Sequence, residues 1–266
     1  MESKPRFSVV VPAYNEVGRI EPTLKDLLFT LDLRSTEGYE ILVVMDGCND
    51  GTPKSVVEVM NNRSNTVALI LPNRLGKGGA IKEALKHAKG DLIAFVDADG
   101  SVPSMELCRL LELARGYDLV IGSRYREGSI LLQERPLIRA VLSRSFNVLA
   151  RLLFWRLSGI RDTQCGVKIF KRSLVNSIGK DLLITDFTFD VNLIYSALSA
   201  GFKVKEVGIT WTEKEGSKMS SGLAKQSFAM LFSLLRLRIQ YSRLREMLSS
   251  RLLGKLTGPI YYWMRP

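Results

Sequence analysis

The chain has 266 residues, 46% of them hydrophobic, with three cysteines, one histidine and a formal net charge of +11. This length and apolar content predict a folded unit with its own core and exclude a disordered chain, and the scattered cysteines with a lone His87 exclude a disulfide framework and a zinc site. The charge is unevenly distributed: residues 1–122 hold 14 Lys and Arg against 17 Asp and Glu, whereas residues 123–266 hold 24 against 10. We therefore expect the second half to bind an anionic partner, which could be nucleic acid, a phosphorylated substrate or an anionic membrane surface.

Short apolar runs alternate with helical patterns through the first half of the chain. The runs, each stopped by Gly, Pro, Asn or Asp, predict strands within residues 6–15, 39–47, 66–72, 91–100 and 117–124. Helices are expected between them at residues 21–33, 52–61, 78–89 and 104–114. Because this alternation requires crossover connections, it predicts an α/β fold with a mainly parallel sheet covered by helices on both faces.

Polar segments follow four of these predicted strands. They are "PAYNE" at residues 12–16, "MDGCNDG" at 45–51, "DADGS" at 97–101 and "GSR" at 122–124. Ligands of parallel sheets bind beyond the carboxyl ends of the strands, so all four segments should open onto one crevice. Asp97 and Asp99 stand out there, because two carboxylates at the edge of a core are unfavourable unless a cation lies near them.

A family resemblance gives these segments a common meaning. The motifs "VVVPAYNE", "VVMDGCNDGT", "NRLGKGGAIKEAL" and "FVDADG" resemble, in order and spacing, the inverting family 2 glycosyltransferases with the GT-A fold. Further along, "DTQCGVKIF", "FTFDVNLIYSALSAGFKVKEV" and "WTEKEGSKM" look like the branch of dolichyl-phosphate glucosyltransferases and dolichyl-phosphate mannose synthases. The resemblance implies a GT-A catalytic domain over residues 1–220, followed by a basic amphipathic helical segment over residues 221–266.

The resemblance gives the aspartate pair a metal to hold. A nucleotide sugar carries two phosphates whose charge grows as the glycosyl bond breaks, and a divalent cation bridging them stabilises the leaving group. Asp97 and Asp99 would bind it, as Mg²⁺ or Mn²⁺, since both ions prefer hard oxygen ligands. The family often has a glutamine where this chain has Ser101. The alternative is turn chemistry, since Asp-Gly is a common turn pair, although a turn needs only one aspartate.

The resemblance also implies a donor pocket. Its expected residues are Pro12, Ala13, Tyr14, Glu16, Asp46, Lys77, Gly78, Asp97, Ala98 and Asp99. Of these, Pro12, Tyr14 and Glu16 would line the base and ribose, and Asp46 would accept an N–H of the base; taken singly, each is also an ordinary loop residue. Lys77 and the neighbouring glycines lie at a predicted helix start, where backbone N–H groups favour an anion.

The expected acceptor is a polyprenyl (dolichyl) phosphate. A hydroxyl acceptor needs a carboxylate or histidine to take its proton, whereas a phosphate arrives ionised and needs only cations to position it. The residues assigned to it by resemblance are Arg124, Ser143, Arg144, Lys214, Ser217 and Lys218; Arg124, Arg144 and the sugar-side Gln164 join Asp97 and Asp99 in the expected catalytic set. Each arginine could instead be a solvated surface charge, and Asp190 a structural or helix-end carboxylate.

Two later segments, residues 136–157 and 223–248, mix Leu, Phe and Trp with Arg. No run reaches the ~18 to 20 apolar residues of a spanning helix, so we expect interfacial helices of a peripheral protein on the cytoplasmic face of a membrane. The alternative is that these helices pack on the domain or on another subunit, with their arginines reaching water. The N-terminus enters the first strand directly, which predicts no signal peptide.

The sequence therefore predicts a hexosyltransferase that moves sugar from a nucleotide diphosphate to a polyprenyl phosphate with inversion, UDP-glucose being favoured and GDP-mannose next. A hydroxyl-acceptor transferase is the alternative within enzymes and would need a base. A non-catalytic nucleotide-sugar-binding protein would share most motifs. Nucleic acid is not an expected partner, because no reader motif is found and the strand-end carboxylates would be unexplained. Metal identity, lipid length and oligomeric state are not indicated.

Overall fold

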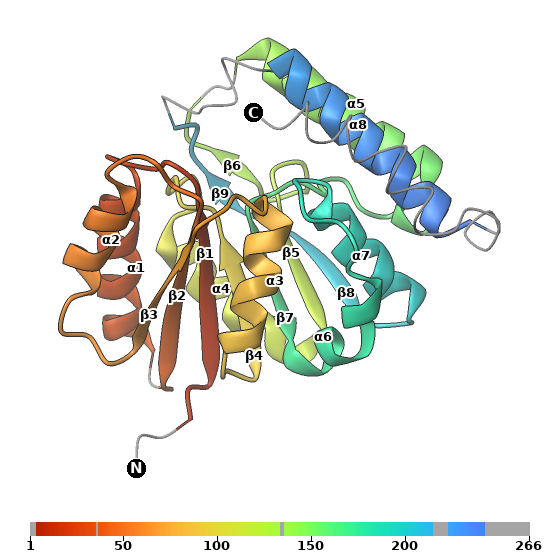
Figure 1. Cartoon of the computed structure of the whole chain (residues 1–266). Helices are drawn as coiled ribbons and strands as arrows, with labels where there is room; N and C mark the ends of the chain where they lie inside the picture. Colours follow the sequence, from red (N-terminus) through yellow and green to blue (C-terminus); the bar gives the residue numbers. More distant parts are fainter. Residues whose placement is uncertain (1–3, 36, 134–135, 215–222, 243–266) are drawn as a thin grey trace.

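Strands and helices alternate along the chain in the computed structural model, which describes residues 4–35, 37–133, 136–214 and 223–242 (Figure 1). The strands are β1 (Phe7–Ala13), β2 (Tyr39–Asp46), β3 (Thr66–Leu71), β4 (Leu92–Val96), β5 (Leu119–Ser123), β6 (Ile130–Leu131), β7 (Val167–Lys171), β8 (Val204–Gly208) and β9 (Thr210–Trp211). The helices are α1 (Ile20–Arg34), α2 (Thr52–Met60), α3 (Lys77–His87), α4 (Ser104–Leu113), α5 (Leu137–Leu153), α6 (Arg172–Ile178), α7 (Phe189–Ser199) and α8 (Leu223–Gln240). The five strands and four helices predicted for the first half are confirmed, with helix ends shifted by one or two residues.

Seven strands form one sheet in the order β3-β2-β1-β4-β7-β5-β8. Its pairs are parallel except those of β7, which runs antiparallel to both β4 and β5. The mainly parallel sheet is therefore confirmed, and the reversed strand is an addition to it. Its direction follows from the path of the chain: residues 124–166 carry β6 and α5 beyond the carboxyl end of β5 and re-enter the sheet from that side (Figure 1).

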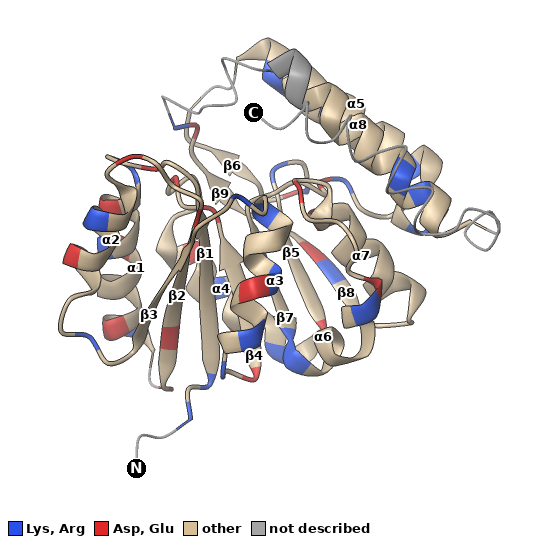
Figure 2. Ribbon diagram, viewed as in Figure 1, with Lys and Arg blue, Asp and Glu red and all other residues tan. Residues whose placement is uncertain are grey.

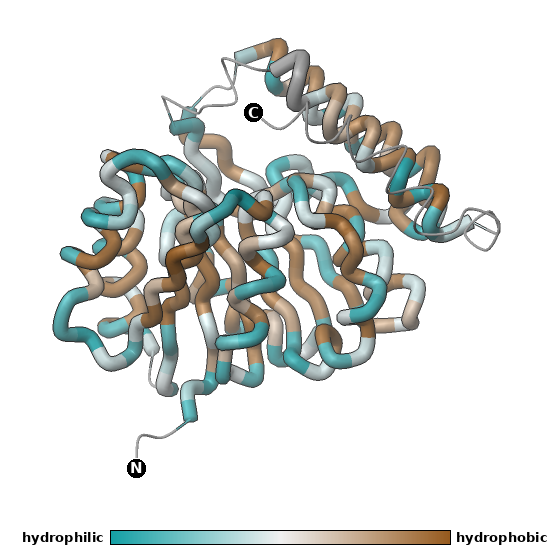
Figure 3. The backbone as a smooth tube through the Cα atoms, in the orientation of Figure 1, coloured by the Kyte–Doolittle hydropathy of each residue, from teal (hydrophilic) through white to brown (hydrophobic). Residues whose placement is uncertain are grey.

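Apolar side chains alternate between the two faces of the sheet, as the period of a strand requires. Val9 and Val11 of β1 join a core with α1, α2 and α4, whereas Val10 joins a second core with α3, α6 and α7. Burial on both faces explains why the central strands read as near-continuous apolar runs (Figure 3). The parallel strands all deliver their carboxyl ends to one edge of this sandwich.

Helices α5 and α8 lie side by side above that edge (Figure 1). Leu234 and Leu237 of α8 are fully buried and belong to the second core, so α8 packs against the same unit as the sheet. Neither helix contains an acidic residue, and both carry arginine (Figure 2). Helices were expected within residues 136–157 and 223–248; α5 confirms the first over Leu137–Leu153 and α8 the second over Leu223–Gln240. The expected boundary at residue 220 lies outside the described residues.

Candidate functional site

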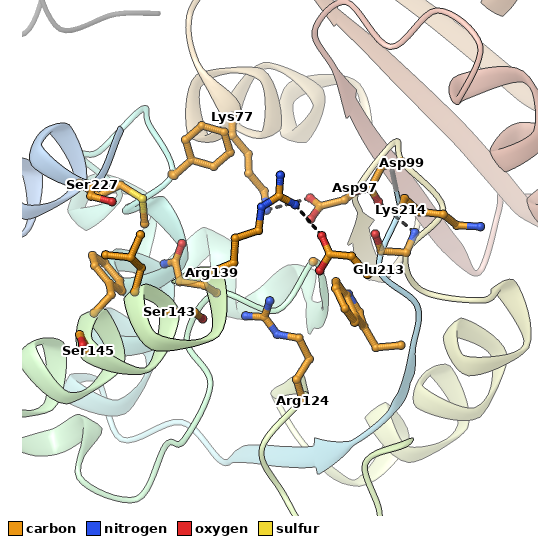
Figure 4. Close-up of a pocket in the computed structure, with 18 of the residues that line it drawn as sticks. Lys77, Asp97, Asp99, Arg124, Arg139, Ser143, Ser145, Glu213, Lys214 and Ser227 are labelled. Carbon is orange, nitrogen blue, oxygen red and sulfur yellow. Dashed lines mark hydrogen bonds and ion pairs between the residues drawn. The ribbon is translucent and has the colours of Figure 1, made fainter. Parts of the chain in front are cut away.

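A pocket of about 320 Å³ opens between the carboxyl edge of the sheet and the helix pair α5–α8. Described residues from nearly every part of the chain line it: Lys77, Asp97, Asp99, Ser101, Arg124, Arg139, Leu142, Ser143, Ser145, Phe146, Leu149, Gln164, Gly166, Phe187, Trp211, Glu213, Lys214, Ser227, Met230 and Leu231. Charged side chains gather on the sheet side of the pocket, and apolar side chains of α5 and α8 form the other side (Figure 4).

Asp97 and Asp99 directly follow β4 and both line this pocket, as predicted. Ala98 between them is buried in the core, so the two carboxylates point away from it on the same side of the chain. Asp99 accepts the backbone N–H of Ser101 at 2.9 Å, which is the turn contact of the alternative interpretation. Asp97 makes no such contact: its Oδ1 lies 2.9 Å from the Lys77 ammonium. Turn chemistry therefore explains part of the role of Asp99 and none of that of Asp97.

Lys77 is the first residue of α3, and its ammonium lies 2.9 Å from Asp97 Oδ1. Burial raises the pKa of Asp97 above its ordinary value, Lys77 opposes that shift, and the charge of Asp99 adds to it. Burial lowers the pKa of Lys77, but the carboxylates of Asp190 and Asp97 outweigh it and leave that pKa above its usual value. Lys77 is thus a charged ammonium beside the two aspartates at neutral pH.

The other residues of the predicted donor pocket lie outside the lining of this cavity. Asp46 ends β2, is nearly fully buried, and accepts the backbone N–H groups of Leu75 and Gly76 at 2.6 and 2.7 Å, which fixes the approach to α3. Gly76 has a φ of 90°, a conformation that glycine adopts without strain. A contact between Asp46 and a nucleobase stays a prediction.

Around the first strand end, Pro12 and Ala13 belong to β1 and Tyr14 follows it. The Arg74 guanidinium lies 3.7 Å from the centre of the Tyr14 ring, a contact that the sequence analysis missed. Glu16 pairs with Arg19 at 2.5 Å. Gly78 packs in α3 against Phe189: a Cβ at this glycine would lie 2.5 Å from that of Phe189. Base and ribose roles for this group stay predictions.

Arg124, at the carboxyl end of β5, lines the pocket as predicted. Its guanidinium donates to both oxygens of Asp162, at 2.7 and 2.9 Å, and both side chains are almost fully buried. Burial raises the pKa of Asp162, but the charge and hydrogen bonds of Arg124 outweigh it and hold that pKa below the ordinary value. The planar, bidentate pair holds Arg124 rigidly against the pocket wall.

Gln164, two residues after Asp162, also lines the pocket. Its backbone N–H donates to Asp162 at 3.2 Å, while its side-chain Nε2 is buried and has no hydrogen-bond partner among the described residues. Buried donors are nearly always satisfied. An unsatisfied amide at the wall of a pocket is therefore suited to a ligand oxygen, in keeping with its expected place near the sugar.

The arginine that α5 contributes to the pocket differs from the one expected. Arg144 is exposed, with its guanidinium carbon 5.6 Å from the centre of the Tyr125 ring, and is not among the lining residues. Arg139 lines the pocket and pairs with Glu213 at 2.6 Å (Figure 4). The sequence analysis named neither member of this pair. Helical spacing offers a signal, because Arg139 lies four residues before the predicted Ser143 and so shares its face, whereas Arg144 does not.

Ser143 and Lys214 line the pocket, and Ser143 accepts a hydrogen bond from the Tyr125 hydroxyl at 3.0 Å; their role in binding the acceptor phosphate stays a prediction. The predicted acceptor residues Ser217 and Lys218 lie outside the described residues. Leu142, Phe146 and Leu149 of α5 face Met230 and Leu231 of α8 across the apolar side of the pocket. The pocket therefore suits a ligand with a charged head and an apolar tail.

Comparison with known proteins places this geometry in a family. Residues 8–179 match the family described as Glycosyl transferase family 2. The chain belongs to this family. A "Dolichyl-phosphate beta-glucosyltransferase" of Dictyostelium discoideum is 33% identical over 247 residues, covering 88% of this chain and 74% of the relative. The human protein of the same name is 33% identical over 228 residues, covering 80% of this chain and 69% of that protein. These relatives are hexosyltransferases, the class of enzyme that the sequence predicted for this family 2 chain.

Solved structures confirm the GT-A fold of this family 2 glycosyltransferase. Glucosyl-3-phosphoglycerate synthase from Mycobacterium tuberculosis, in complex with Mn²⁺, UDP and glucosyl-3-phosphoglycerate, has a TM-score of 0.62 and 19% identity, covering 86% of this chain and 80% of that one. The same enzyme with phosphoglyceric acid gives a TM-score of 0.67 at 19% identity, with 88% and 80% covered. At this identity the likeness concerns the fold alone.

Whether a metal suits this family 2 site depends on its donor set. Among the described residues, no group of three or more His, Cys, Asp or Glu side chains could hold a metal ion by itself. Mg²⁺ and Mn²⁺ at phosphate sites, however, are bound by one or two carboxylates, with water and phosphate oxygens completing the shell. Asp97 and Asp99 supply that pair of hard oxygen donors within one pocket, so they suit an ion that arrives with a diphosphate.

In the part of the chain that the structure describes, no helix is long and apolar enough to cross a membrane.

Proposed function

We infer that this family 2 glycosyltransferase transfers a hexose from a nucleotide-diphosphate sugar to a polyprenyl phosphate, with inversion at the anomeric carbon. UDP-glucose is the favoured donor and GDP-mannose the next, and dolichyl phosphate is the favoured acceptor, in line with the names of the relatives. The observation that carries this proposal is the division of the pocket into a charged end at Asp97, Asp99 and Lys77 and an apolar end between α5 and α8.

At the charged end, Asp97 and Asp99 would hold Mg²⁺ or Mn²⁺, which supplies Lewis-acid stabilisation to the departing diphosphate. Lys77 brings a further positive charge to this end, since its ammonium lies 2.9 Å from Asp97. The orphaned Nε2 of Gln164 is available to orient an oxygen of the sugar. These side chains would fix the donor with its anomeric carbon turned toward the apolar end.

In the reaction, an acceptor phosphate oxygen forms a bond to the anomeric carbon while the bond to the diphosphate oxygen breaks on the opposite face. The phosphate attacks in its ionised form, so no proton has to be removed. Arg139 lies between the charged groups and the serines of α5 and α8 (Figure 4), where it would position the acceptor phosphate. Arg124, fixed by Asp162, adds a second guanidinium to the same wall.

A hydroxyl acceptor would need a general base instead. Besides Asp97 and Asp99, one described carboxylate lines the pocket, Glu213, and no described histidine does. Glu213 is the observation that favours this second candidate function. Its ion pair with Arg139 at 2.6 Å opposes it, because the carboxylate already contacts a guanidinium and would have to leave it to reach an acceptor hydroxyl.

The lipid would run between α5 and α8, and the same helices would dock on the membrane. Their outward apolar side chains include Leu137, Leu152 and Phe228, which are 80%, 78% and 70% exposed, and Trp155 follows α5 at 70%. Such a surface beside arginines suits the interface of an anionic bilayer. The place of the enzyme on the cytoplasmic face of a membrane stays a prediction.

The test is a transfer assay with dolichyl phosphate in detergent or vesicles, with radiolabelled UDP-glucose and GDP-mannose in parallel, and with Mg²⁺, Mn²⁺ or a chelator. We expect label from UDP-glucose to enter the organic phase and the chelator to prevent it. Label that stays in water while the donor still binds would contradict the lipid-phosphate acceptor. In that case a glycan or protein acceptor should be labelled, and Glu213→Gln should abolish that labelling if Glu213 is its base.

A further inference from the structure

Beneath the pocket lie two buried charged residues, Lys168 and Asp190, that the proposed reaction does not use. Lys168 lies on the central strand β7 and is fully buried, and Asp190 at the start of α7 is 1% exposed. The Lys168 ammonium lies 2.6 Å from Asp190 Oδ1, and the other oxygen of Asp190 lies 3.3 Å from the Lys77 ammonium. Lys77 in turn contacts Asp97 at 2.9 Å. Three side chains from α3, α7 and β7 thus connect the interior to one aspartate of the pocket.

The charges of these buried side chains depend on one another. Removing one partner of a buried ion pair leaves an uncompensated charge, which is strongly unfavourable. Here Asp190 compensates two ammonium groups at once, and both ammonium groups lie over the ring of Phe95, at 5.3 Å for Lys77 and 5.2 Å for Lys168. Lys168 also donates to the carbonyl of Cys165 at 2.8 Å. Since Asp190 is nearly inaccessible and does not line the pocket, it has no direct contact with a ligand there.

The Asp97 carboxylate is held on two sides by this region. Lys77 fixes Oδ1, while Gly166 lies against Oδ2, so that a Cβ at Gly166 would sit 2.2 Å from that oxygen. The backbone N–H of Asp97 also donates to the Gly166 carbonyl at 3.0 Å. Gly166 immediately precedes β7, the strand that carries Lys168. The entry to β7 therefore supports both the backbone and the carboxylate of Asp97.

We propose that Asp190 is a positioning residue that draws part of the Lys77 charge away from Asp97, so that the Asp97 carboxylate stays available to a divalent cation, and that Lys168 is the second counter-ion of Asp190. This inference rests on the proposed function, in which Asp97 is a metal ligand. Without Asp190, the Lys77 ammonium would pair with Asp97 alone, and Lys168 would add a second uncompensated positive charge below the site. Both changes make the surroundings of Asp97 more positive and so weaken the binding of a divalent cation there.

The experiment titrates Mn²⁺ into the full chain with saturating UDP by calorimetry, and compares Asp190→Asn, Lys168→Met and the double variant. Asp190→Asn should weaken Mn²⁺ binding ~10- to 100-fold, the range for losing a residue that supports a metal ligand. Lys168→Met should not weaken it, because Asp190 then attracts Lys77 more strongly and releases Asp97. The double variant should recover part of this loss but still bind Mn²⁺ more weakly than the wild type, because Lys168 no longer adds a charge while Lys77 still pairs with Asp97 alone.

Asp118→Asn is the matched control, since Asp118 pairs with Lys171 at the far end of the same strand, at 2.9 Å. It should leave Mn²⁺ binding unchanged. A purely structural role for Asp190 would lower melting temperatures without changing Mn²⁺ affinity, and that result overturns the inference, as would equal weakening by Lys168→Met. If Asp190→Asn does not fold, the double variant and Lys168→Met still decide. A wild type that binds UDP but no Mn²⁺ would contradict the metal assignment in the proposed function itself.

Discussion

The two ends of the pocket are built from different parts of the molecule and by different means. The charged end comes from the loops after β4 and β5 and from the start of α3, where ion pairs such as Lys77–Asp97 and Arg124–Asp162 fix each side chain. The opposite end comes from α5 and α8, which carry no acidic residue and offer mainly apolar side chains. Side chains fixed by ion pairs suit a reaction at one atom of the substrate, whereas the apolar surface of α5 and α8 suits a long, flexible ligand. The predictions below address the two ends separately.

The largest effect is expected at the charged end. Asp99→Ala should lower turnover by at least ~100-fold, because a bound divalent cation contributes several kcal/mol of charge stabilisation to phosphate chemistry. The fold should persist, since Asp99 makes one local turn contact, with the N–H of Ser101. Transfer assays report the first result, and circular dichroism with thermal melting reports the second. If the variant has a lower melting temperature and loses activity only in proportion to the fraction of unfolded protein, Asp99 has a turn role alone.

Stability at the charged end should depend on Asp162. Asp162→Asn leaves the buried Arg124 guanidinium unpaired and should destabilise the fold by about 3–5 kcal/mol at pH 7. Because the pKa of Asp162 is lower in the folded chain than its ordinary 3.8, the wild-type carboxylate stabilises the fold above that pH. This stabilisation disappears as the pH falls through the folded pKa. Melting temperatures of wild type and variant should therefore converge below about pH 4, and a constant difference down to pH 3 would contradict the assignment.

The charged end was more predictable from sequence than the apolar end, for a physical reason. Strand-end motifs are local: an apolar run stopped by "DADGS" or "GSR" places its polar residues at the sheet edge whatever follows. The antiparallel direction of β7 was not predictable in this way, since it depends on where the chain re-enters the sheet. Lys168 within "VKIF" gave no local sign of burial, because its partner Asp190 comes from another helix.

The arginine of α5 illustrates the same limit. Resemblance pointed to Arg144, whereas the helix turns Arg139 toward the pocket together with Leu142, Ser143 and Phe146. Which face of an amphipathic helix lines a site depends on its neighbour, here α8. Residue spacing therefore shows which residues of α5 share a face, but only the packing against α8 shows which face lines the pocket.

Between the two ends, Arg139 and Arg144 offer a matched test of the acceptor site. Arg139→Gln should raise the KM for dolichyl phosphate ~10- to 100-fold, the equivalent of one hydrogen bond to a charged group, and leave UDP affinity unchanged. Arg144→Gln should have a smaller effect, since that side chain is exposed outside the pocket. Glu213→Gln combined with Arg139→Gln separates the loss of phosphate binding from the loss of the Arg139–Glu213 ion pair. A larger KM effect for Arg144→Gln would favour the residue that the resemblance indicated.

The smallest effect concerns the outer surface of the apolar end. Leu137→Ser combined with Leu152→Ser should weaken binding to anionic lipid vesicles about tenfold, because a leucine that leaves water completely contributes roughly 1.5–3 kcal/mol and we expect these two side chains to leave it only in part. The melting temperature should hardly change, since both side chains are about four-fifths exposed, at 80% and 78%. Phe29→Ser is the control: Phe29 is 68% exposed on α1, far from the helix pair, and should not affect vesicle sedimentation. If Phe29→Ser weakens binding as much as the double change does, vesicles adsorb to general apolar surface, and α5 and α8 hold no special place at the membrane. If only the α5 variant is affected, the apolar side of the pocket and the membrane-facing surface are two sides of one helix, and a lipid could pass from bilayer to Arg139 without crossing water.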